Sequence, residues 1–258
     1  MPSPTRRARR VASDPYVEPR VGTAGWSLPR AEQPHFPAEG THLERYAARL
    51  NAVEINSSFY RPHRPSTYAR WAASVPAAFR FAVKVPRAIT HERRLADAEP
   101  LLDAFLAEVA ALGDRLGPLL VQLPPSLRFD APVAAAFLAA LRERHAGAVA
   151  IEPRHASWFT EEAAALLAER RVARVAADPP RAGVDGEPGG WSGLLYYRLH
   201  GSPRIYYSAY DGDYLRALAA RLGAAAAAGV PAWCIFDNTA AGAATANALE
   251  VRAPLARD

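Results

Sequence analysis

Lysine occurs once in this sequence, and that residue, Lys84, is well suited to proton transfer. The chain has 258 residues and 31 Lys and Arg side chains, so arginine supplies all the other basic residues of these two types. An arginine keeps its proton in proteins, whereas burial lowers the pKa of an ammonium group until it acts as acid, base or nucleophile. We therefore expect Lys84 to carry chemistry.

Other polar side chains come at the ends of short apolar runs. Side chains alternate across a strand, so residues two apart share a face. In the run 52–55, Val53 and Ile55 share one face while Glu54 and Asn56 share the other. The same alternation puts polar residues at the ends of later runs: Lys84, Gln122, Glu152, Arg198, His200, and Asp237 or Asn238. In a parallel barrel these side chains converge at the carboxyl mouth, where barrel enzymes hold their active sites.

The residue types at these ends suit acid and base chemistry. Glu152 or Glu54 would serve as the general base. Lys84 would act as an acid or stabilise a developing oxyanion, and His200 would return the proton. Aromatic and basic side chains that follow the runs suit a small-molecule ligand, namely a sugar, polyol or nucleotide-like molecule. The expected ligand-binding side chains are Asn56, Tyr60, Gln122, Arg154, Trp158, Arg198, Tyr207, Tyr210 and Asn238.

Other interpretations of the same residues stay open. A divalent metal is a candidate cofactor, in a sugar isomerase or phosphodiesterase-like enzyme, and its ligands would be Glu152, Asp178, His200 and Asp237. A retaining glycosidase would use Glu54 and Glu152 about 5.5 Å apart. The cluster also fits a purely structural set of charges, with Lys84 paired to Glu152. The sequence specifies neither the reaction nor the cofactor.

A non-catalytic ligand-binding or nucleic-acid-binding protein is a further alternative. The formal net charge is +5, and four of these charges belong to Arg6, Arg7, Arg9 and Arg10. The rest of the chain is therefore almost neutral, whereas a nucleic-acid-binding surface needs many basic groups. We expect nucleic acid to be a less favoured partner than a small molecule.

Eight apolar runs alternate with helical patterns between residues 20 and 251. The expected strands are 20–23, 52–55, 79–85, 119–123, 148–151, 172–176, 194–199 and 232–236. Helix starts are expected at Thr41 with Glu44, at Asp130 and at Thr160. This order predicts an α/β fold, a single (β/α)8 barrel of the TIM type, although a doubly wound open sheet has the same periodicity. Between the sixth and seventh strands, residues 177–193 are rich in Pro and Gly, which predicts a loop crossover.

The chain is expected to form one domain over residues 18–258, preceded by a disordered Arg-rich tail over residues 1–17. No apolar run is long enough to span a bilayer. Cys234 is the single cysteine, which excludes an internal disulfide. Together with the lack of a secretion signal, this favours a bacterial cytoplasmic protein; the oligomeric state is not predicted.

Several sequence blocks resemble a bacterial and archaeal family, the domain of unknown function 72. They are VGTAGWS at 21–27, VEINSSFYR at 53–61, FRFAVKVPRAITH at 79–91, LGPLLVQLPPSLRFD at 116–130, IEPRHASWF at 151–159, YYRLHG at 196–201 and IFDNTAAGAA at 235–244. The resemblance covers residues 21–251 and implies a TIM-barrel-like fold with an unknown activity. Positions that match the family's recurring motifs are Glu54, Asn56, Phe59, Tyr60, Lys84, Gln122, Glu152, Arg154, Arg198, His200 and Asn238.

The sequence departs from that family pattern in three places. Leu28 stands where an aromatic residue commonly follows GWS, and the segment after it is shortened. Both differences leave the shape of one pocket wall open. Asp237 stands where Asn is frequent, which changes the charge at the mouth and adds a candidate metal ligand.

Overall fold

Strands and helices alternate along the part of the chain that the computed structural model describes, residues 16–180 and 186–256. The strands are β1 Arg20–Thr23, β2 Ala52–Ile55, β3 Arg80–Lys84, β4 Leu116–Gln122, β5 Val149–Glu152, β6 Ala173–Arg174, β7 Ala176–Asp178, β8 Gly189–Gly190, β9 Leu195–Leu199 and β10 Ala232–Phe236. The α-helices are α1 His42–Ala47, α2 Pro65–Ala73, α3 Glu99–Val109, α4 Ala131–Arg144, α5 Glu161–Glu169, α6 Gly212–Ala227 and α7 Ala243–Arg252. Short 3-10 helices span Gln33–His35, Ser57–Phe59, Ala110–Arg115, Ala156–Trp158 and Ala253–Leu255, and a π-helical turn spans Ala88–Glu92.

The expected helix starts are confirmed by their caps. The Thr41 hydroxyl accepts from the Glu44 N–H while the Glu44 carboxylate accepts from the Thr41 N–H, a reciprocal capping box that opens α1. Asp130 caps α4 and Thr160 caps α5 through their side-chain oxygens. Each cap satisfies backbone donors that a helix leaves unpaired at its first turn, so helix positions were readable from sequence.

The strands form two sheets, which are parallel except for one short pair. One sheet has the order β1-β10-β9-β7 and the other β2-β3-β4-β5-β6-β8, with β8 antiparallel to β6. The expected strands agree with those observed, apart from the sixth, which is divided: β6 pairs with β5, and β7 pairs with β9. The fold is therefore α/β with two mainly parallel sheets, and hydrogen bonding does not assign all the strands to one continuous sheet.

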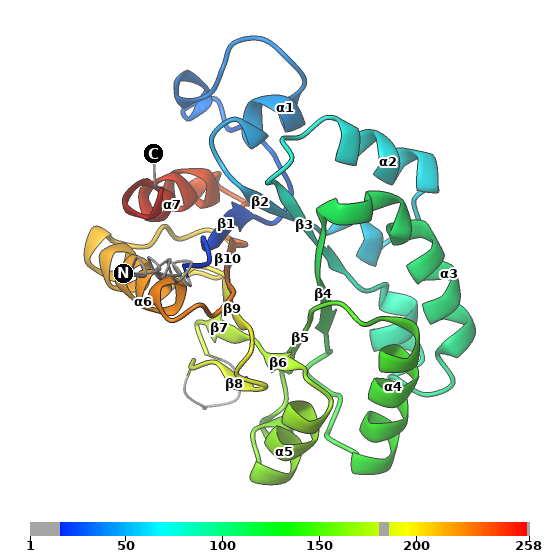
Figure 1. Cartoon of the computed structure of the whole chain (residues 1–258). Coiled ribbons are helices and arrows are strands. Elements are labelled where there is room, and N and C mark those ends of the chain that lie inside the picture. Colours follow the sequence, from blue (N-terminus) through cyan, green and yellow to red (C-terminus); the bar gives the residue numbers. More distant parts are fainter. Residues whose placement is uncertain (1–15, 181–185, 257–258) are drawn as a thin grey trace, which may run out of the picture.

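The two sheets adjoin at two places, through the chain itself on one side and through a bridge on the other. On one side β6 and β7 are consecutive, and Val175 between them donates its N–H to the β5 carbonyl of Ile151 at 2.8 Å. On the other side Ala24 bridges to Glu54. Gly22 permits this approach, because a Cβ there would lie 1.9 Å from the Ala52 carbonyl oxygen. The two sheets thus lie next to each other, and the helices lie outside the strands (Figure 1).

The crossover and the N-terminal segment were both predicted from composition. The described parts of the crossover at residues 177–193 contain no helix, and Gly189–Gly190 instead pairs with β6. Residues 1–15 of the expected Arg-rich tail lie outside the described residues. At its end, Val17 donates its N–H to the Ala226 carbonyl at 3.1 Å, so this residue already contacts the folded part.

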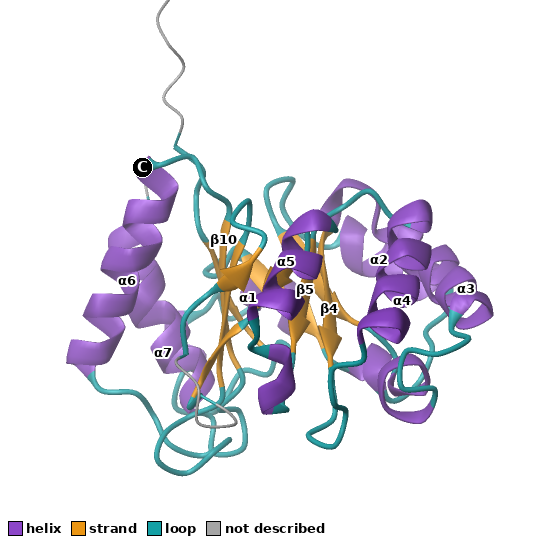
Figure 2. Cartoon of the chain, turned by 90° about the horizontal axis from the view of Figure 1, so that it is seen from below, coloured by secondary structure: helices purple, strands orange, loops and turns teal. Residues whose placement is uncertain are grey.

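Apolar side chains form two separate clusters. The larger one packs the outward residues of the strands, such as Val53 and Val83, against the surrounding helices, which cover the strands in Figure 2. The smaller one fills the inside with inward residues, such as Ala82, Leu120 and Tyr196. The alternation predicted from sequence is therefore present, and the inner cluster supports the polar residues next along each strand. Within the described residues, no helix is long and apolar enough to cross a membrane.

Candidate active site

A layer of buried polar side chains lies at the carboxyl ends of the strands. Glu54 comes from β2, Lys84 from β3, Gln122 from β4, Glu152 from β5 and Arg198 from β9. His200 and Asp237 follow directly after β9 and β10, and all seven side chains are buried. Both sheets thus contribute to one cluster, as the spacing predicted.

The guanidinium of Arg198 is the centre of this cluster. It donates to Glu54 at 2.8 Å and to Glu152 at 3.1 Å and forms an ion pair with Asp237 at 3.1 Å, although its side chain is only 1% exposed. Burial alone would lower the pKa of Arg198, but Asp237, Glu54 and Glu152 together raise it well above its ordinary value. Arg198 is therefore a permanent cation that holds three carboxylates together.

Both oxygens of the Glu152 carboxylate are occupied by donors. Gln122 lies 3.3 Å from each of them, His200 Nε2 lies 3.0 Å from Oε1, and Arg154 also binds Oε1 at 3.2 Å. Burial favours the neutral acid, but Arg198 and His200 outweigh it and hold the pKa of Glu152 well below its usual range. A carboxylate that is held in its charged form by several hydrogen-bond donors and cations is a poor proton acceptor.

Glu54 is engaged in the same manner. Its oxygens accept from Arg198 and, at 2.9 Å, from the Tyr196 hydroxyl. Neither Glu54 nor Glu152 reaches solvent. Both carboxylates are thus buried and bonded to neighbouring donors.

His200 bridges two of the carboxylates. Its Nε2 lies 3.0 Å from Glu152 and its Nδ1 lies 3.0 Å from Asp237. Burial opposes the charged ring, but Glu152 and Asp237 raise the pKa of His200 above 6.5. The pKa of Asp237 is lowered, because Arg198 and His200 overcome the effect of its burial. The imidazolium form, which this shift favours, donates from both ring nitrogens.

Lys84 differs from its neighbours because its ammonium has no acidic partner within bonding distance among the described residues. Its side chain is 7% exposed, and Nζ lies 4.0 Å from the centre of the Phe59 ring. Burial and the charge of Arg198 lower the pKa of Lys84 to about 8, against the opposing effect of Glu54, Glu152 and Asp237. A group with this pKa both donates and accepts protons near neutral pH.

The pKa of Lys84 is directly measurable because the chain has no other lysine. In protein labelled with ¹³C-lysine, one Cε resonance is expected, and its shift should titrate with a midpoint near 8. The Lys84→Arg variant should lack the resonance and so prove its assignment. A midpoint at the ordinary value of 10.5 would contradict the burial and electrostatic environment described here.

Other residues expected to bind ligand differ in how they lie. Asn56 follows Glu54 on the inward face, and its buried Oδ1 has no hydrogen-bond partner. Arg154 uses Nε and Nη2 to hold Glu152. Tyr60 is 72% exposed, and Tyr207 is exposed with the Arg204 guanidinium 3.9 Å from its ring centre. Asn56 and Arg154 thus adjoin the polar layer, while the structure shows no contact of the two tyrosines with it.

Three further expected residues bond to the surrounding structure, although the buried Oδ1 of Asn238, like that of Asn56, has no hydrogen-bond partner among the described residues. Trp158 is buried, donates to the Leu127 carbonyl at 3.0 Å and packs on Phe129. Tyr210 donates to Asp178 Oδ1 at 2.8 Å. Asn238 donates to Asn247 at 3.0 Å. The sequence placed these side chains near strand ends but not their orientation, which packing of the following helices determines.

The candidate metal ligands do not form a site of metal-binding geometry. The Asp178 carboxylate accepts from the Tyr210 hydroxyl, and in the described part of the chain only its backbone carbonyl bonds to one of the other three, the N–H of His200. Glu152, His200 and Asp237 are bonded to one another and to Arg198, so a cation already lies among the carboxylates. Across residues 16–180 and 186–256, no group of three or more His, Cys, Asp or Glu side chains is arranged to hold a metal ion.

Two contributors to this region, Tyr196 and His91, are not among the site residues predicted from the sequence. Tyr196 shares the inward face of β9 with Arg198, so the strand alternation contained the signal for it. Phe59 contacts Lys84, and its ring lies 5.0 Å from that of His91. His91 comes from the π-helical turn after β3, and nothing in the spacing indicates that turn. Contacts between loops are therefore the part of the site that alternation does not predict.

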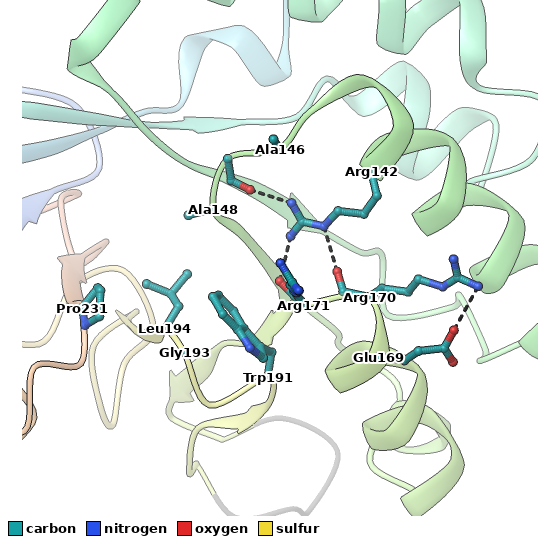
Figure 3. A pocket seen from close by; sticks show the side chains of 11 residues that line it. Arg142, Ala146, Ala148, Glu169, Arg170, Arg171, Trp191, Gly193, Leu194 and Pro231 are labelled. Carbon is teal, nitrogen blue, oxygen red and sulfur yellow. Dashed lines mark hydrogen bonds and ion pairs between the residues drawn. The ribbon is translucent and has the colours of Figure 1, made fainter.

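A cavity of about 540 Å³ lies at the opposite, amino ends of the strands (Figure 3). Its wall includes Trp191 and Arg142, but the Arg142 guanidinium donates to the carbonyls of Arg170, Arg171 and Gly147. This cation therefore fixes the ends of neighbouring segments. Polar groups at this end of parallel strands usually serve stability, whereas the carboxyl end carries chemistry.

Comparison with known proteins agrees with this arrangement. Solved structures of DUF72 family proteins from Enterococcus faecalis V583 and Thermotoga maritima MSB8 superpose with TM-scores of 0.77 and 0.75, at 23% and 24% identity. Each covers 93% of this chain, and 97% and 99% of the respective structure is matched. At this identity the likeness establishes the fold.

Two curated relatives match part of the sequence. UPF0759 protein YecE of Escherichia coli K12 is 35% identical over 98 residues, which are 38% of this chain and 36% of the relative. UPF0759 protein YunF of Bacillus subtilis 168 is 26% identical over 111 residues, which are 41% and 39%. The matched segment thus spans little more than a third of either relative. The family model described as "Protein of unknown function DUF72" matches residues 20–258, and the chain belongs to that family.

Proposed function

We propose that this protein is an enzyme of acid and base chemistry, with Lys84 as its proton-transfer group. The observation that carries the proposal is a single, nearly buried ammonium without an ion-pair partner among the described residues, beside three ordered carboxylates. A structural role would favour a paired lysine, because an unpaired buried charge costs stability. Poorly satisfied buried charges with shifted pKa values are typical of active sites.

The proposal includes a barrel architecture, in which the two sheets act as one closed (β/α)8 unit. It is supported by the bridge from Ala24 to Glu54. It is also supported by the consecutive strands β6 and β7, which pair with β5 in one sheet and with β9 in the other. The Tyr46 hydroxyl adds a link, since it accepts from the Thr23 N–H at 2.8 Å and donates to the Ala52 carbonyl at 3.0 Å. The polar layer would then occupy the carboxyl mouth of the barrel.

In this mechanism the carboxylates position cations rather than accept protons. Glu54 and Glu152 hold Arg198, and Glu152 also holds His200. Asp237 has one oxygen, Oδ2, on Arg198 and His200 and shows no bond to Oδ1 among the described residues, so that oxygen is free to accept from a ligand. Lys84 then takes or delivers the proton, and Arg198 fixes the field around it.

The ligand class is a small polyhydroxylated or nucleotide-like molecule. The β2 and β3 strands pair Ile55 with Val83, so the next residues, Asn56 and Lys84, lie side by side. The unpartnered Oδ1 of Asn56 is suited to accept from a ligand hydroxyl or N–H group. A ligand hydroxyl there would place the neighbouring carbon within reach of the Lys84 ammonium.

The test uses proton exchange, which can be followed before the substrate is identified. The protein is incubated in D₂O with sugar phosphates, polyols and nucleotides, and deuterium uptake or conversion is followed by mass spectrometry and ¹H NMR. We expect wild-type protein to act on at least one compound, with a rate that rises through pH 8 as Lys84 becomes neutral. The Lys84→Arg variant keeps the charge and should lose this activity.

An Arg216→Lys variant is the matched control for this test. The Arg216 guanidinium is exposed and pairs with Asp213. Replacing this arginine by lysine, the reverse of Lys84→Arg, should therefore leave activity unchanged. Equal activity of wild type and Lys84→Arg would overturn the role of Lys84. Absence of exchange with every compound class would overturn the proposed ligand class.

A further inference from the structure

A second cavity adjoins the polar layer on its outer side. It has a volume of about 320 Å³ and lies between the loops after β2 and β3 and the α3 helix. Its apolar wall consists of Phe59, Pro62, Pro86, Leu101 and Phe105. This size is at the lower end for small-molecule sites, and it suits one ring rather than a whole ligand.

Phe59 connects the cavity with the candidate active site. Its ring lines the cavity, and the Lys84 ammonium lies 4.0 Å from the centre of the same ring. His91 packs against the edge of the same ring. A molecule in the cavity therefore contacts a side chain that Lys84 contacts, and the two regions are neighbours across one aromatic ring.

Two basic and two acidic side chains line the cavity, and the arginines are the groups that could hold an anion. Arg61 and Arg87 both line the cavity. Arg87 pairs with Glu92 at 3.2 Å, but both side chains are more than half exposed, so this pair is weak. Arg61 has no acidic partner within bonding distance in the described part of the chain. The other acid, Glu108, accepts from the His63 N–H at 3.4 Å.

We propose that this cavity binds the aromatic ring of an anionic ligand, with the ligand's oxyanion held by Arg61 and Arg87. The inference rests on the proposed function in one respect, because it makes the cavity a subsite of the ligand that reaches Lys84. The class of ligand is an aryl oxyanion, in which the oxyanion is a phosphate or a carboxylate. Apolar burial of the ring supplies affinity and the two arginines supply orientation.

The experiment measures binding by calorimetry with four probes: phenyl phosphate, benzoate, inorganic phosphate and phenol. One of the two aryl oxyanions should bind at least about tenfold more tightly than inorganic phosphate or phenol. An aryl oxyanion uses both the ring contact and the charge, whereas phosphate lacks the ring and phenol lacks the oxyanion. Comparison of phenyl phosphate with benzoate distinguishes the two oxyanions. If neither phenyl phosphate nor benzoate binds more tightly than inorganic phosphate and phenol, the ring subsite is overturned.

Substitutions at two alanines locate the binding site. Ala104 lies exposed on α3 and lines this cavity, so Ala104→Phe fills it and should weaken binding about tenfold or more. Ala136→Phe is the matched control, because Ala136 is an exposed α4 residue that lines a separate cavity of about 290 Å³. Equal loss of binding in both variants, or in neither, would overturn the assignment.

The lysine resonance separates this proposal from the proposed function. A bound aryl oxyanion should shift the Lys84 Cε signal through the Phe59 contact, and Ala104→Phe should abolish the shift. Binding that is sensitive to Ala104→Phe would support the cavity even if no proton exchange occurred. Binding without any shift of the Lys84 signal would overturn the claim that the cavity is a subsite of the Lys84 region.

Discussion

Replacement of Arg198 by methionine should lower the free energy of unfolding by about 3 to 5 kcal/mol, the cost typical of breaking a buried charge network from one side. Glu54, Glu152 and Asp237 each lose a donor in this variant. Arg198 is 1% exposed, so water does not replace the lost bonds. The carboxylates would have to take up protons or open the layer to solvent, and either process costs stability.

Urea unfolding at pH 7 measures this effect, with Arg216→Met as the matched control. The Arg216 side chain is 71% exposed and pairs with an exposed Asp213, so its removal should change stability by less than about 1 kcal/mol. If Arg198→Met fails to fold, Arg198→Lys keeps the charge while losing the forked geometry and should show a partial loss. A change below about 1 kcal/mol for Arg198→Met would contradict the central role given to this guanidinium.

The stability cost of Arg198→Met should also depend on pH. The carboxyl groups of Glu152 and Asp237 have lowered pKa values, and Arg198 is a principal cause of both shifts. Their contribution is present above the ordinary pKa of the acids and is lost as pH falls through the lowered values. The difference between wild type and variant should therefore narrow in strongly acidic solution.

Strand alternation explains how much of this site could be predicted. Glu54, Gln122, Glu152 and Arg198 each follow an inward apolar residue by two positions, and the structure brings all four together. The rule works because the backbone fixes which face a strand residue occupies. It does not predict which side chains are hydrogen-bonded to each other, because the bonds from Arg198 to Glu54 join residues 144 positions apart.

Residues on loops were harder to place than residues on strands. Trp158 and Tyr210 lie on the loops after β5 and β9, as Arg154 does after β5, yet the first lies in the core and the second bonds to Asp178. A loop side chain has no fixed face, so packing of the next helix decides its direction. The division of the sixth strand has a similar origin, since β6 and β7 pair with different neighbours.

Replacement of Lys84 by methionine should raise the free energy of unfolding at pH 7, whereas Arg198→Met should lower it. The fall of the pKa of Lys84 from 10.5 to about 8 corresponds to about 3 kcal/mol of destabilisation of the charged form. Removal of the buried ammonium should therefore stabilise the variant by about this amount, and loss of the cation–π contact with Phe59 offsets about 1 to 2 kcal/mol of it. The expected net gain is therefore about 1 to 2 kcal/mol, from a substitution that should also end proton transfer.

The pH dependence of this gain identifies its cause. Below pH 8 the folded wild-type protein carries the buried ammonium, so the full cost is present. Between pH 8 and 10.5 the unfolded chain binds more protons at Lys84 than the folded chain, so wild-type stability rises with pH relative to Lys84→Met. Urea unfolding of both proteins from pH 6 to 10 should thus show a gap that narrows above pH 8. A variant that is less stable than wild type at pH 7 would show instead that the carboxylates hold Lys84 as a structural partner, and acid and base chemistry would then need another residue.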